Sequence, residues 1–292
     1  MLTGLSMKKA TAHSCRGLCM TDYSKLDHPE ILSHIFYPQK ETVTPLPPGA
    51  CDFTVIVEPG VTIGCRFHIT DPSAPCILYF HGNGETVSDL DSIGQRYNEA
   101  GMNLLVTDYR GYGWSTGQPS VSAMFSDGEI LFQESKKWMA DNGYTGAFFL
   151  MGRSLGSACA IDLAAKFSDE IKGVIIESGF ADTLPLACSL GLELNDHDIS
   201  EDECFNNMAK IALITKPTFI LHGALDEIIP AAEAEKLQAF CGAKSKEFQI
   251  VPGADHNSIV SVAGNLYFQV IKQFIDKITG VSSWRTRRKA AK

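Results

Sequence analysis

One short stretch of the chain has the residue types and spacing of a nucleophile. Residues 148–157 read FFLMGRSLGS, so Ser154 follows an apolar run and lies between Gly152 and Gly156. This G-x-S-x-G spacing is typical of a sharp strand-to-helix turn, where glycines avoid collisions and the serine is held out above the sheet. The N–H groups that begin the following helix favour developing negative charge. The stretch therefore predicts Ser154 as a catalytic nucleophile.

A serine nucleophile needs a base and an acid that orients the base, and the sequence offers both. His256 lies in the loop VPGADHNSI, between the last predicted strand and the last predicted helix. Asp226 comes four residues after the preceding strand, in FILHGALDEIIP. The chain order Ser154, Asp226, His256 is the order expected of a triad built on a nucleophile elbow. We predict that these three residues form one.

Other residues compete for the same roles. Glu227 is a more plausible substitute for Asp226 than Asp255 is. Asp255 ranks behind both. It directly precedes His256 in the sequence, and side chains at neighbouring loop positions usually point away from each other. His197 lies in an acidic stretch, where a solvated surface position is expected.

An oxyanion hole is the remaining requirement for attack on an acyl carbon. The loop after CILYF reads His81-Gly82-Asn83-Gly84-Glu85, and its glycines let main-chain N–H groups approach a ligand closely. We predict the main-chain amides of Asn83 and Leu155 as the two donors. His81 is expected to brace this loop through hydrogen bonds rather than act as a second base.

The elements that position these residues follow an alternating pattern. Short runs that are apolar on both faces predict buried strands, at residues 76–80, 103–108, 147–151, 173–177, 217–222 and 247–251. Amphipathic stretches between and after them predict helices near residues 88–100, 121–141, 155–167, 231–241 and 257–278. Residues 52–69 predict a hairpin across a Pro-Gly turn. The pattern indicates an α/β fold with an open, mainly parallel sheet.

The sequence suggests three parts. Residues 1–48 form an N-terminal extension and a proline-rich linker, residues 49–280 form the α/β domain, and residues 281–292 form a basic tail that is expected to be solvated. An insertion at about residues 181–215 is longer than a crossover needs and rich in acidic residues. It is interpreted either as a solvated surface excursion or as a small cap over the carboxyl edge of the sheet.

The motifs together resemble one superfamily. HGNGE, DYRGYGWSTGQPS, GRSLGS, LHGALDEIIP and GADHN occur in this order and look like those of the α/β-hydrolases. Within that superfamily the chain resembles the abhydrolase-domain serine hydrolases related to the yeast bud-emergence protein and to the protein depalmitoylases. The resemblance implies an eight-stranded, mostly parallel sheet with an antiparallel first hairpin, and a structural role for residues 108–113. One departure is Glu85, a carboxylate near the predicted hole that would order water or disfavour anionic substrates.

The composition of the chain limits which cellular compartment and which binding partners we expect for it. The formal net charge of −9 and the ordinary apolar content predict a globular chain with no nucleic acid partner. The chain has nine cysteines, an odd number, and residues 1–20 contain no continuous apolar run of the kind found in a secretory leader. These observations predict reduced thiols and a cytoplasmic location. Cys15 and Cys19 are four residues apart, but a lone pair does not define a metal site. We expect no cofactor, no metal and no integral membrane segment, and the sequence gives no indication of oligomeric state.

These observations predict a serine hydrolase that cleaves a carboxylic ester or thioester through an acyl-enzyme. Its substrate is expected to be a small molecule or an acyl group carried by another molecule. Two alternatives remain: a catalytically silent binding protein with the same fold, and a peptidase. The intact set of triad residues argues against the first, because a protein without catalysis is free to lose them.

Overall fold

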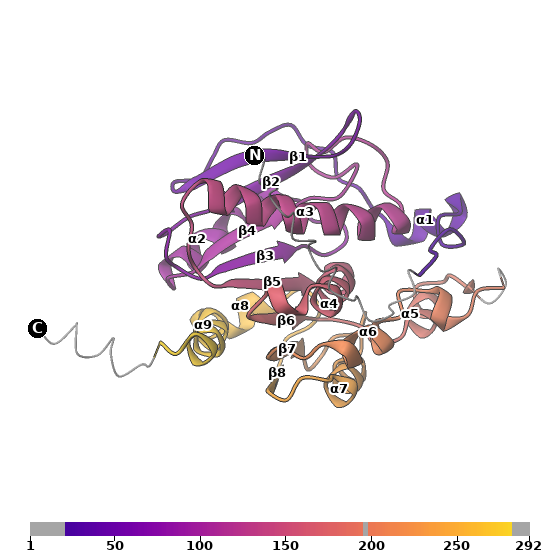
Figure 1. Ribbon diagram of the computed structural model, residues 1–292. Coiled ribbons are helices and arrows are strands. Elements are labelled where there is room, and N and C mark those ends of the chain that lie inside the picture. Colours follow the sequence, from indigo (N-terminus) through magenta and orange to yellow (C-terminus); the bar gives the residue numbers. More distant parts are fainter. Residues whose placement is uncertain (1–20, 195–197, 282–292) are drawn as a thin grey trace, which may run out of the picture.

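The structure is a computed structural model that describes residues 21–194 and 198–281, and an eight-stranded sheet forms its centre (Figure 1). The strand order is β1-β2-β4-β3-β5-β6-β7-β8. The strands are β1 (Ala50–Glu58), β2 (Val61–His68), β3 (Cys76–Phe80), β4 (Asn103–Thr107), β5 (Phe148–Arg153), β6 (Gly173–Glu177), β7 (Thr218–Gly223) and β8 (Lys246–Val251).

Nine α-helices lie in the described residues. They are α1 (Pro29–Ile35), α2 (Asp91–Glu99), α3 (Val121–Asp141), α4 (Leu155–Lys166), α5 (Thr183–Ser189), α6 (Asn207–Leu213), α7 (Ala231–Phe240), α8 (Ile259–Ala263) and α9 (Asn265–Thr279). Short 3₁₀ turns add η1 (Val87–Leu90), η2 (Ser168–Glu170) and η4 (Glu201–Glu203).

The pairing of the strands confirms the predicted fold class. Strands β3 to β8 pair in parallel, while β2 pairs antiparallel with both β1 and β4. The hairpin therefore contributes one strand, β2, that runs against all the others. Parallel strands end at the same edge, so the loops after β3, β5, β7 and β8 meet there. In Figure 1 the arrowheads of β3 and β5 point toward the side where α1 and α5 lie.

Helices cover both faces of the sheet, and β3 shows how the strands serve both layers. Its residues Cys76, Leu78 and Phe80 pack in one buried cluster with α3, α4 and α7. Its residues Ile77 and Tyr79 pack in a second cluster with α2, α8 and α9. A strand buried on both faces has no polar side to alternate, which is why these strands are nearly continuous apolar runs.

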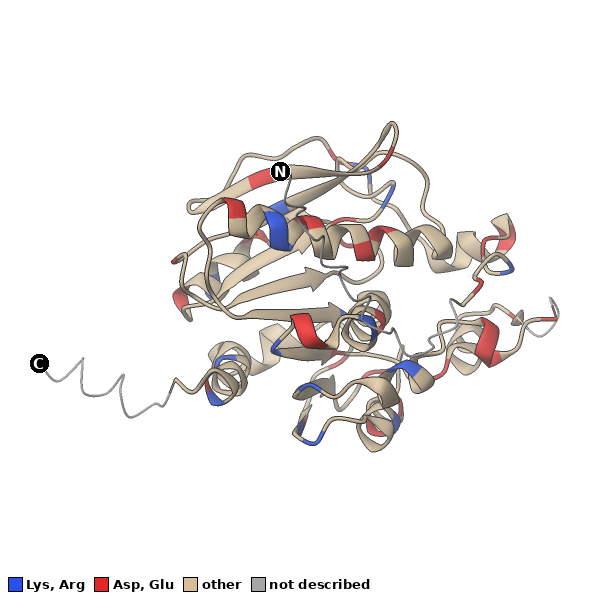
Figure 2. Ribbon diagram, viewed as in Figure 1, with Lys and Arg blue, Asp and Glu red and all other residues tan. Residues whose placement is uncertain are grey.

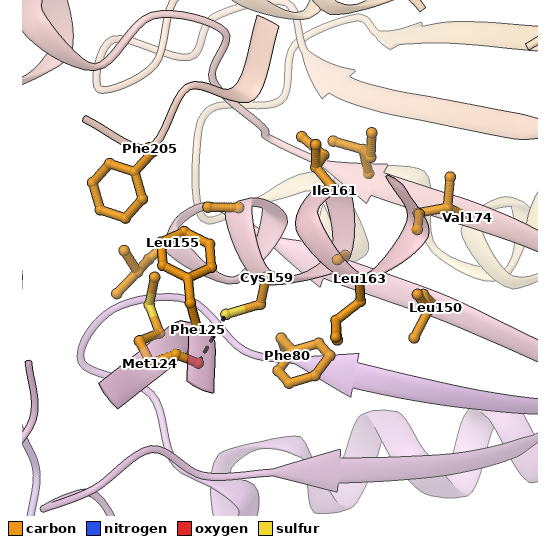
Figure 3. Close-up of a cluster of buried hydrophobic side chains, with 14 of the residues drawn as sticks. Phe80, Met124, Phe125, Leu150, Leu155, Cys159, Ile161, Leu163, Val174 and Phe205 are labelled. Carbon is orange, nitrogen blue, oxygen red and sulfur yellow. Dashed lines mark hydrogen bonds between the residues drawn. The ribbon is translucent and has the colours of Figure 1, made fainter. Parts of the chain in front are cut away.

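Helix α4, which begins at the residue after Ser154, is fixed by close packing on its neighbours. Leu155, Cys159 and Leu163 recur at every fourth position and face α3 and the end of β3 (Figure 3). The Cys159 thiol lies 3.9 Å from the main-chain oxygen of Met124 in α3. This packing holds the start of α4, and with it the turn that carries the serine, against the sheet.

Charged residues lie mostly outside the centre of the fold. Strands β3 and β4 contain none, and Figure 2 shows acidic and basic residues distributed over the surrounding helices and loops. Most charged residues are therefore solvated, and exceptions such as Arg66, Arg153 and Glu177 are buried with partners of opposite charge.

Two local features differ from the sequence-based expectations. The helix expected over residues 257–278 is divided at Gly264, whose φ of 56° ends α8 and starts α9. The N-terminal extension contains a helix, α1, where no periodicity predicted one. Ile31 and Phe36 are buried in the main core, so α1 and the residue that follows it pack against the α/β domain.

Some expectations lie outside the described residues or are not tested. Cys15, Cys19, His197 and the basic residues of the tail fall in the ranges that the structure does not describe. In the described ranges, none of the helices is long and apolar enough to cross a membrane. The domain boundaries and the cytoplasmic location stay predictions.

The packing of α4 predicts a large cost for removing one of its core side chains. Leu163 is 1% exposed, so we expect Leu163→Ala to lower the free energy of unfolding by about 2–5 kcal/mol. Leu213 of α6 is 49% exposed, and Leu213→Ala should change it by less than about 0.5 kcal/mol. Urea denaturation measures both values. Equal effects of the two substitutions would contradict the described packing.

Candidate active site

Ser154 occupies a backbone conformation that L-residues rarely adopt. Its φ is 51° and its ψ is −120°, and its main-chain N–H donates to the Glu177 carbonyl oxygen at 3.0 Å. A Cβ on Gly152 would lie 2.1 Å from the oxygen of Gly156, and one on Gly156 would lie 2.1 Å from the oxygen of Phe80. Only glycine fits at both positions, so the two glycines permit the sharp turn that presents the serine.

The structure brings Ser154, His256 and Asp226 together. The Nε2 atom of His256 lies 3.0 Å from Ser154 Oγ, and its Nδ1 atom lies 2.8 Å from Asp226 Oδ2. A carboxylate only accepts hydrogen bonds, so Nδ1 carries the proton and the Nε2 of a neutral imidazole is left to accept from the serine hydroxyl. The geometry is that of a serine hydroxyl beside an oriented base.

The Asp226 carboxylate is held by groups on both of its oxygens. Oδ1 accepts from the main-chain N–H groups of Ile228 at 3.1 Å and Ile229 at 2.8 Å, while Oδ2 faces both His256 and, at 3.3 Å, His222 Nε2. Burial alone would raise the pKa of Asp226, but the hydrogen bonds from His222, His256 and Ile229 hold it well below the ordinary value. The carboxylate therefore stays ionised at neutral pH.

The alternative acids lie elsewhere. Glu227 is exposed on the same turn, and Asp255 is exposed and accepts a hydrogen bond from the main-chain N–H of Asn257 at 2.9 Å. Asp226 is thus the carboxylate that contacts the imidazole in the described structure.

Buried polar contacts of His81 hold the loop after β3. His81 is fully buried, with Nδ1 2.8 Å from the Gly82 oxygen and Nε2 3.3 Å from Asp108 Oδ1. The Tyr109 hydroxyl donates to the His81 oxygen at 2.7 Å. These contacts agree with the expected bracing role of His81 and the scaffold role of residue 108.

The side chain of Asn83 ties this loop to the N-terminal segment. Its Oδ1 accepts from the Tyr112 hydroxyl at 2.6 Å and from the Tyr37 main-chain N–H at 2.9 Å, and its Nδ2 donates to the Ile35 oxygen at 2.7 Å. These bonds fix the orientation of residue 83. In the described part of the chain, the main-chain N–H groups of Asn83 and Leu155 have no hydrogen-bond acceptor.

Both of these residues border an apolar cavity of about 340 Å³ that also contains Ser154 and His256. Three parts of the chain supply its walls: the segment with α1, the strand-end loops, and described residues of the insertion, from 183 to 194 and at 205. The apolar lining is formed by Ile35, Leu155, Phe180, Leu186, Ala187, Leu190, Leu192, Leu194, Phe205, Ile228 and Ile229. The nucleophile therefore faces a space suited to a hydrocarbon group.

Glu85 has a different environment from the one expected. We predicted a carboxylate that would order water or repel anions, but its Oε2 accepts from the Gly82 N–H at 2.6 Å and its Oε1 pairs with Arg153 Nη1 at 2.6 Å. The arginine partly offsets its charge, and the expected effect on water and on anionic substrates stays a prediction.

Three contributing residues were not singled out from the sequence. Arg153 is buried beside the serine, His222 contacts Asp226, and Tyr37 lines the cavity from the N-terminal segment. An arginine at the end of an otherwise apolar strand is a usable signal, because a buried guanidinium requires acidic partners. No comparable signal marks Tyr37, since its position depends on how a remote segment packs.

A metal site has no support among the described residues. No group of three or more His, Cys, Asp or Glu side chains there has an arrangement that could hold a metal ion.

Comparison with known proteins decides the family. Residues 71–189 match the family model described as "Serine aminopeptidase, S33". The chain is 31% identical to the protein bem46 of Schizosaccharomyces pombe over 70% of this chain and 68% of that one. It is also 31% identical to the human alpha/beta hydrolase domain-containing protein 17B, over 75% of this chain and 72% of the relative. The chain belongs to the α/β-hydrolase family.

Solved structures share the fold of this α/β-hydrolase. The Pyrococcus furiosus esterase Pf2001 aligns with a TM-score of 0.67 and 17% identity, covering 82% of this chain and 98% of that one. Est1E of Butyrivibrio proteoclasticus aligns with a TM-score of 0.64 and 17% identity, covering 78% and 99%. Membership of the family and the shared fold support hydrolase activity.

The elbow predicts a severe effect of one added methyl group. Gly156→Ala places a Cβ against the Phe80 oxygen, so we expect a lower melting temperature and loss of reaction of Ser154 with a fluorophosphonate. Gly128 in α3 leaves room for a Cβ, whose nearest neighbour would be Leu163 Cδ1 at 4.0 Å, so Gly128→Ala should leave labelling unchanged and should not lower the melting temperature, because alanine is favoured over glycine inside a helix. Differential scanning fluorimetry and probe labelling test this pair. Full labelling of Gly156→Ala would contradict the steric account.

Proposed function

We propose that this chain is a serine hydrolase that cleaves a carboxylic ester or thioester through an acyl-enzyme, with Ser154, His256 and Asp226 as the triad. The observation that carries the proposal is the 3.0 Å contact between His256 Nε2 and Ser154 Oγ at the wall of the apolar cavity. The family and the esterase-like fold are consistent with this reaction.

The proposed reaction follows from the protonation states. His256 accepts the hydroxyl proton through Nε2 as Ser154 Oγ attacks the carbonyl carbon. Asp226 stabilises the imidazolium that forms, and the negative oxygen is bound by the main-chain N–H groups of Asn83 and Leu155. The imidazolium then gives its proton to the departing alcohol or thiol. A water molecule, deprotonated by His256, then attacks the acyl carbon. The bond from that carbon to Ser154 Oγ breaks, and His256 returns the proton to Oγ as the acid leaves.

The cavity lining supports an apolar acyl group as the substrate. We propose that residues 181–215 act as a cap, because Leu186, Leu190 and Leu194 of this insertion contribute to the walls. Burial of each methylene group of an acyl chain in such a lining contributes about 0.8 kcal/mol. Specificity should therefore rise with chain length until the 340 Å³ volume is filled.

An aminopeptidase reaction, which the name of the matching family model raises, is less well supported. Recognition of a peptide N-terminus requires a negative partner for its ammonium group. Among the residues that the structure describes, the lining of the cavity contains no Asp or Glu side chain, and Glu85 is paired with Arg153. The electrostatics favour an uncharged acyl group.

The first test is covalent labelling. A fluorophosphonate probe should label the protein stoichiometrically at Ser154, and Ser154→Ala should abolish both labelling and hydrolysis of p-nitrophenyl esters. Ser126 is exposed on α3, so Ser126→Ala serves as the control and should behave as wild type. Intact-protein and peptide mass spectrometry identify the site. Absence of labelling in the folded wild-type protein would contradict the proposal.

The second test separates the two neighbouring acids. Asp226→Asn removes the charge that holds the His256 tautomer and should lower kcat by on the order of 10⁴-fold. Glu227 is exposed, and Glu227→Gln should leave kcat within about twofold, as is usual for surface positions away from a site. Steady-state ester hydrolysis measures both. The reverse ranking would assign the acid to Glu227 instead.

A further inference from the structure

Arg153 is a buried cation next to the nucleophile, and the proposed reaction gives it no role. It is 8% exposed and lies between the last apolar residues of β5 and Ser154. Its Nη2 donates to the His256 main-chain oxygen and to Asn257 Oδ1, both at 2.8 Å. Its Nη1 donates to Glu85 Oε1 at 2.6 Å, and its Nε lies 3.5 Å from Glu177 Oε1.

These contacts engage all three nitrogens of the guanidinium, which also borders the cavity. Each of its three nitrogens faces a protein oxygen, and two carboxylates offset its single charge. Burial lowers the pKa of Arg153, but the charge of Glu85 and its other neighbours raises it above the ordinary value, so the group stays cationic. A substrate anion would have to displace these partners. Recognition of a substrate carboxylate or phosphate is therefore not the role that the contacts indicate.

The partners of Arg153 belong to two loops with different tasks. On one side, Glu85 also accepts from the Gly82 N–H at 2.6 Å, next to the residue whose amide is a proposed oxyanion donor. On the other side, the guanidinium holds the main chain of His256 itself and the side chain that follows it. One planar group thus connects the loop of the oxyanion donor to the loop of the base.

The sheet anchors this connection through Glu177. The main-chain oxygen of Glu177, at the end of β6, accepts from the Ser154 N–H, and its carboxylate accepts from the Tyr267 hydroxyl of α9 and faces Arg153. Burial raises the pKa of Glu177, and Arg153 partly offsets that effect. The turn of the nucleophile and the guanidinium therefore share one support.

We propose that Arg153 is a positioning residue that sets the distance between the base at His256 and the oxyanion donor at Asn83, across Ser154. This inference rests on the proposed function of the same site. It predicts that loss of Arg153 impairs the transition state more than substrate binding, because Arg153 borders the cavity but its apolar walls are formed by other side chains. A displacement of about 1 Å in such a constellation costs about 10²-fold in rate.

Lysine cannot replace this arginine. An ammonium group is a compact charge without the planar fork, so it reaches the Glu85 side or the His256 side but not both. The charge alone would be retained in Arg153→Lys. The substitution therefore separates neutralisation of Glu85 from the connection between the two loops.

The experiment is a double-mutant cycle on ester hydrolysis by the full chain. Arg153→Met should lower kcat by about 10²-fold with KM within about threefold of wild type. Asn257 is exposed, so Asn257→Ala should fold and lower kcat by a smaller factor, about tenfold. The kcat of the double variant should lie within about threefold of the kcat of Arg153→Met, because both changes break the same connection. Arg153→Lys should restore the melting temperature to near the wild-type value. It should restore less than a tenth of the kcat that is lost in Arg153→Met.

A matched control separates positioning from stability. Arg66 is fully buried in β2 and pairs with Asp52 and Asp91, both at 2.8 Å, so Arg66→Met removes a comparable buried cation. It should lower the melting temperature without lowering the kcat of the folded fraction.

The outcomes are distinct. Wild-type kcat in Arg153→Met, additive losses in the cycle, or full recovery of kcat in Arg153→Lys would overturn the positioning role. If Arg153→Met does not fold, the kcat of Asn257→Ala decides: a wild-type value overturns the inference, and a tenfold loss with unchanged KM supports it. A wild-type chain that neither hydrolyses esters nor reacts with fluorophosphonate would instead overturn the proposed function.

Discussion

The architecture of the site depends on one constrained turn, in which Ser154 takes a positive φ between two glycines. Because Gly156 lacks a Cβ, which would lie 2.1 Å from the Phe80 oxygen, the start of α4 can approach the end of β3, and the Ser154 N–H bonds to the end of β6. The cost of this conformation is offset by apolar packing of α4 on α3 and the sheet, where Leu155, Cys159 and Leu163 are buried (Figure 3). A rigid, well-packed body thus holds a strained residue at its edge.

Polar contacts then connect the loops around that turn. Asp226 holds the imidazole of His256 from the loop after β7, and Asn83 joins the loop after β3 to the N-terminal segment. These links place a base, two free main-chain N–H groups and an apolar wall around one hydroxyl. Because the donors are main-chain groups and buried side chains, little reorganisation is needed when charge develops. The proposed chemistry follows from this preorganisation.

The sequence predicted the sheet and the main features of the site because both depend on local patterns. The six predicted strands were found within a few residues, since strands such as β3 are apolar on both faces. The predicted burial of residues 247–251 was wrong, because β8 is an edge strand and only its Val251 is buried. Ser154, Asp226 and His256 were found because parallel strands bring their carboxyl-end loops together in a known chain order. Their contacts are present in the structure, and their catalytic roles remain proposals.

The rest depends on contacts between segments far apart in the chain. Helix α1 has seven residues and no clear periodicity, so the burial of Ile31 and the approach of Tyr37 to the cavity left no pattern. The ion pair of Glu85 was not predicted because its partner, Arg153, lies 68 residues away in the chain. The break at Gly264 was missed because the apolar spacing on either side fits one continuous helix.

The most direct measurement is a crystal structure of the phosphonylated protein. The account predicts a bond from phosphorus to Ser154 Oγ, with one phosphonyl oxygen about 2.7–3.1 Å from the main-chain nitrogens of Asn83 and Leu155. The alkyl group should occupy the cavity lined by Leu186 and Leu194. A phosphonyl oxygen turned to solvent, with both N–H groups unbonded, would contradict it.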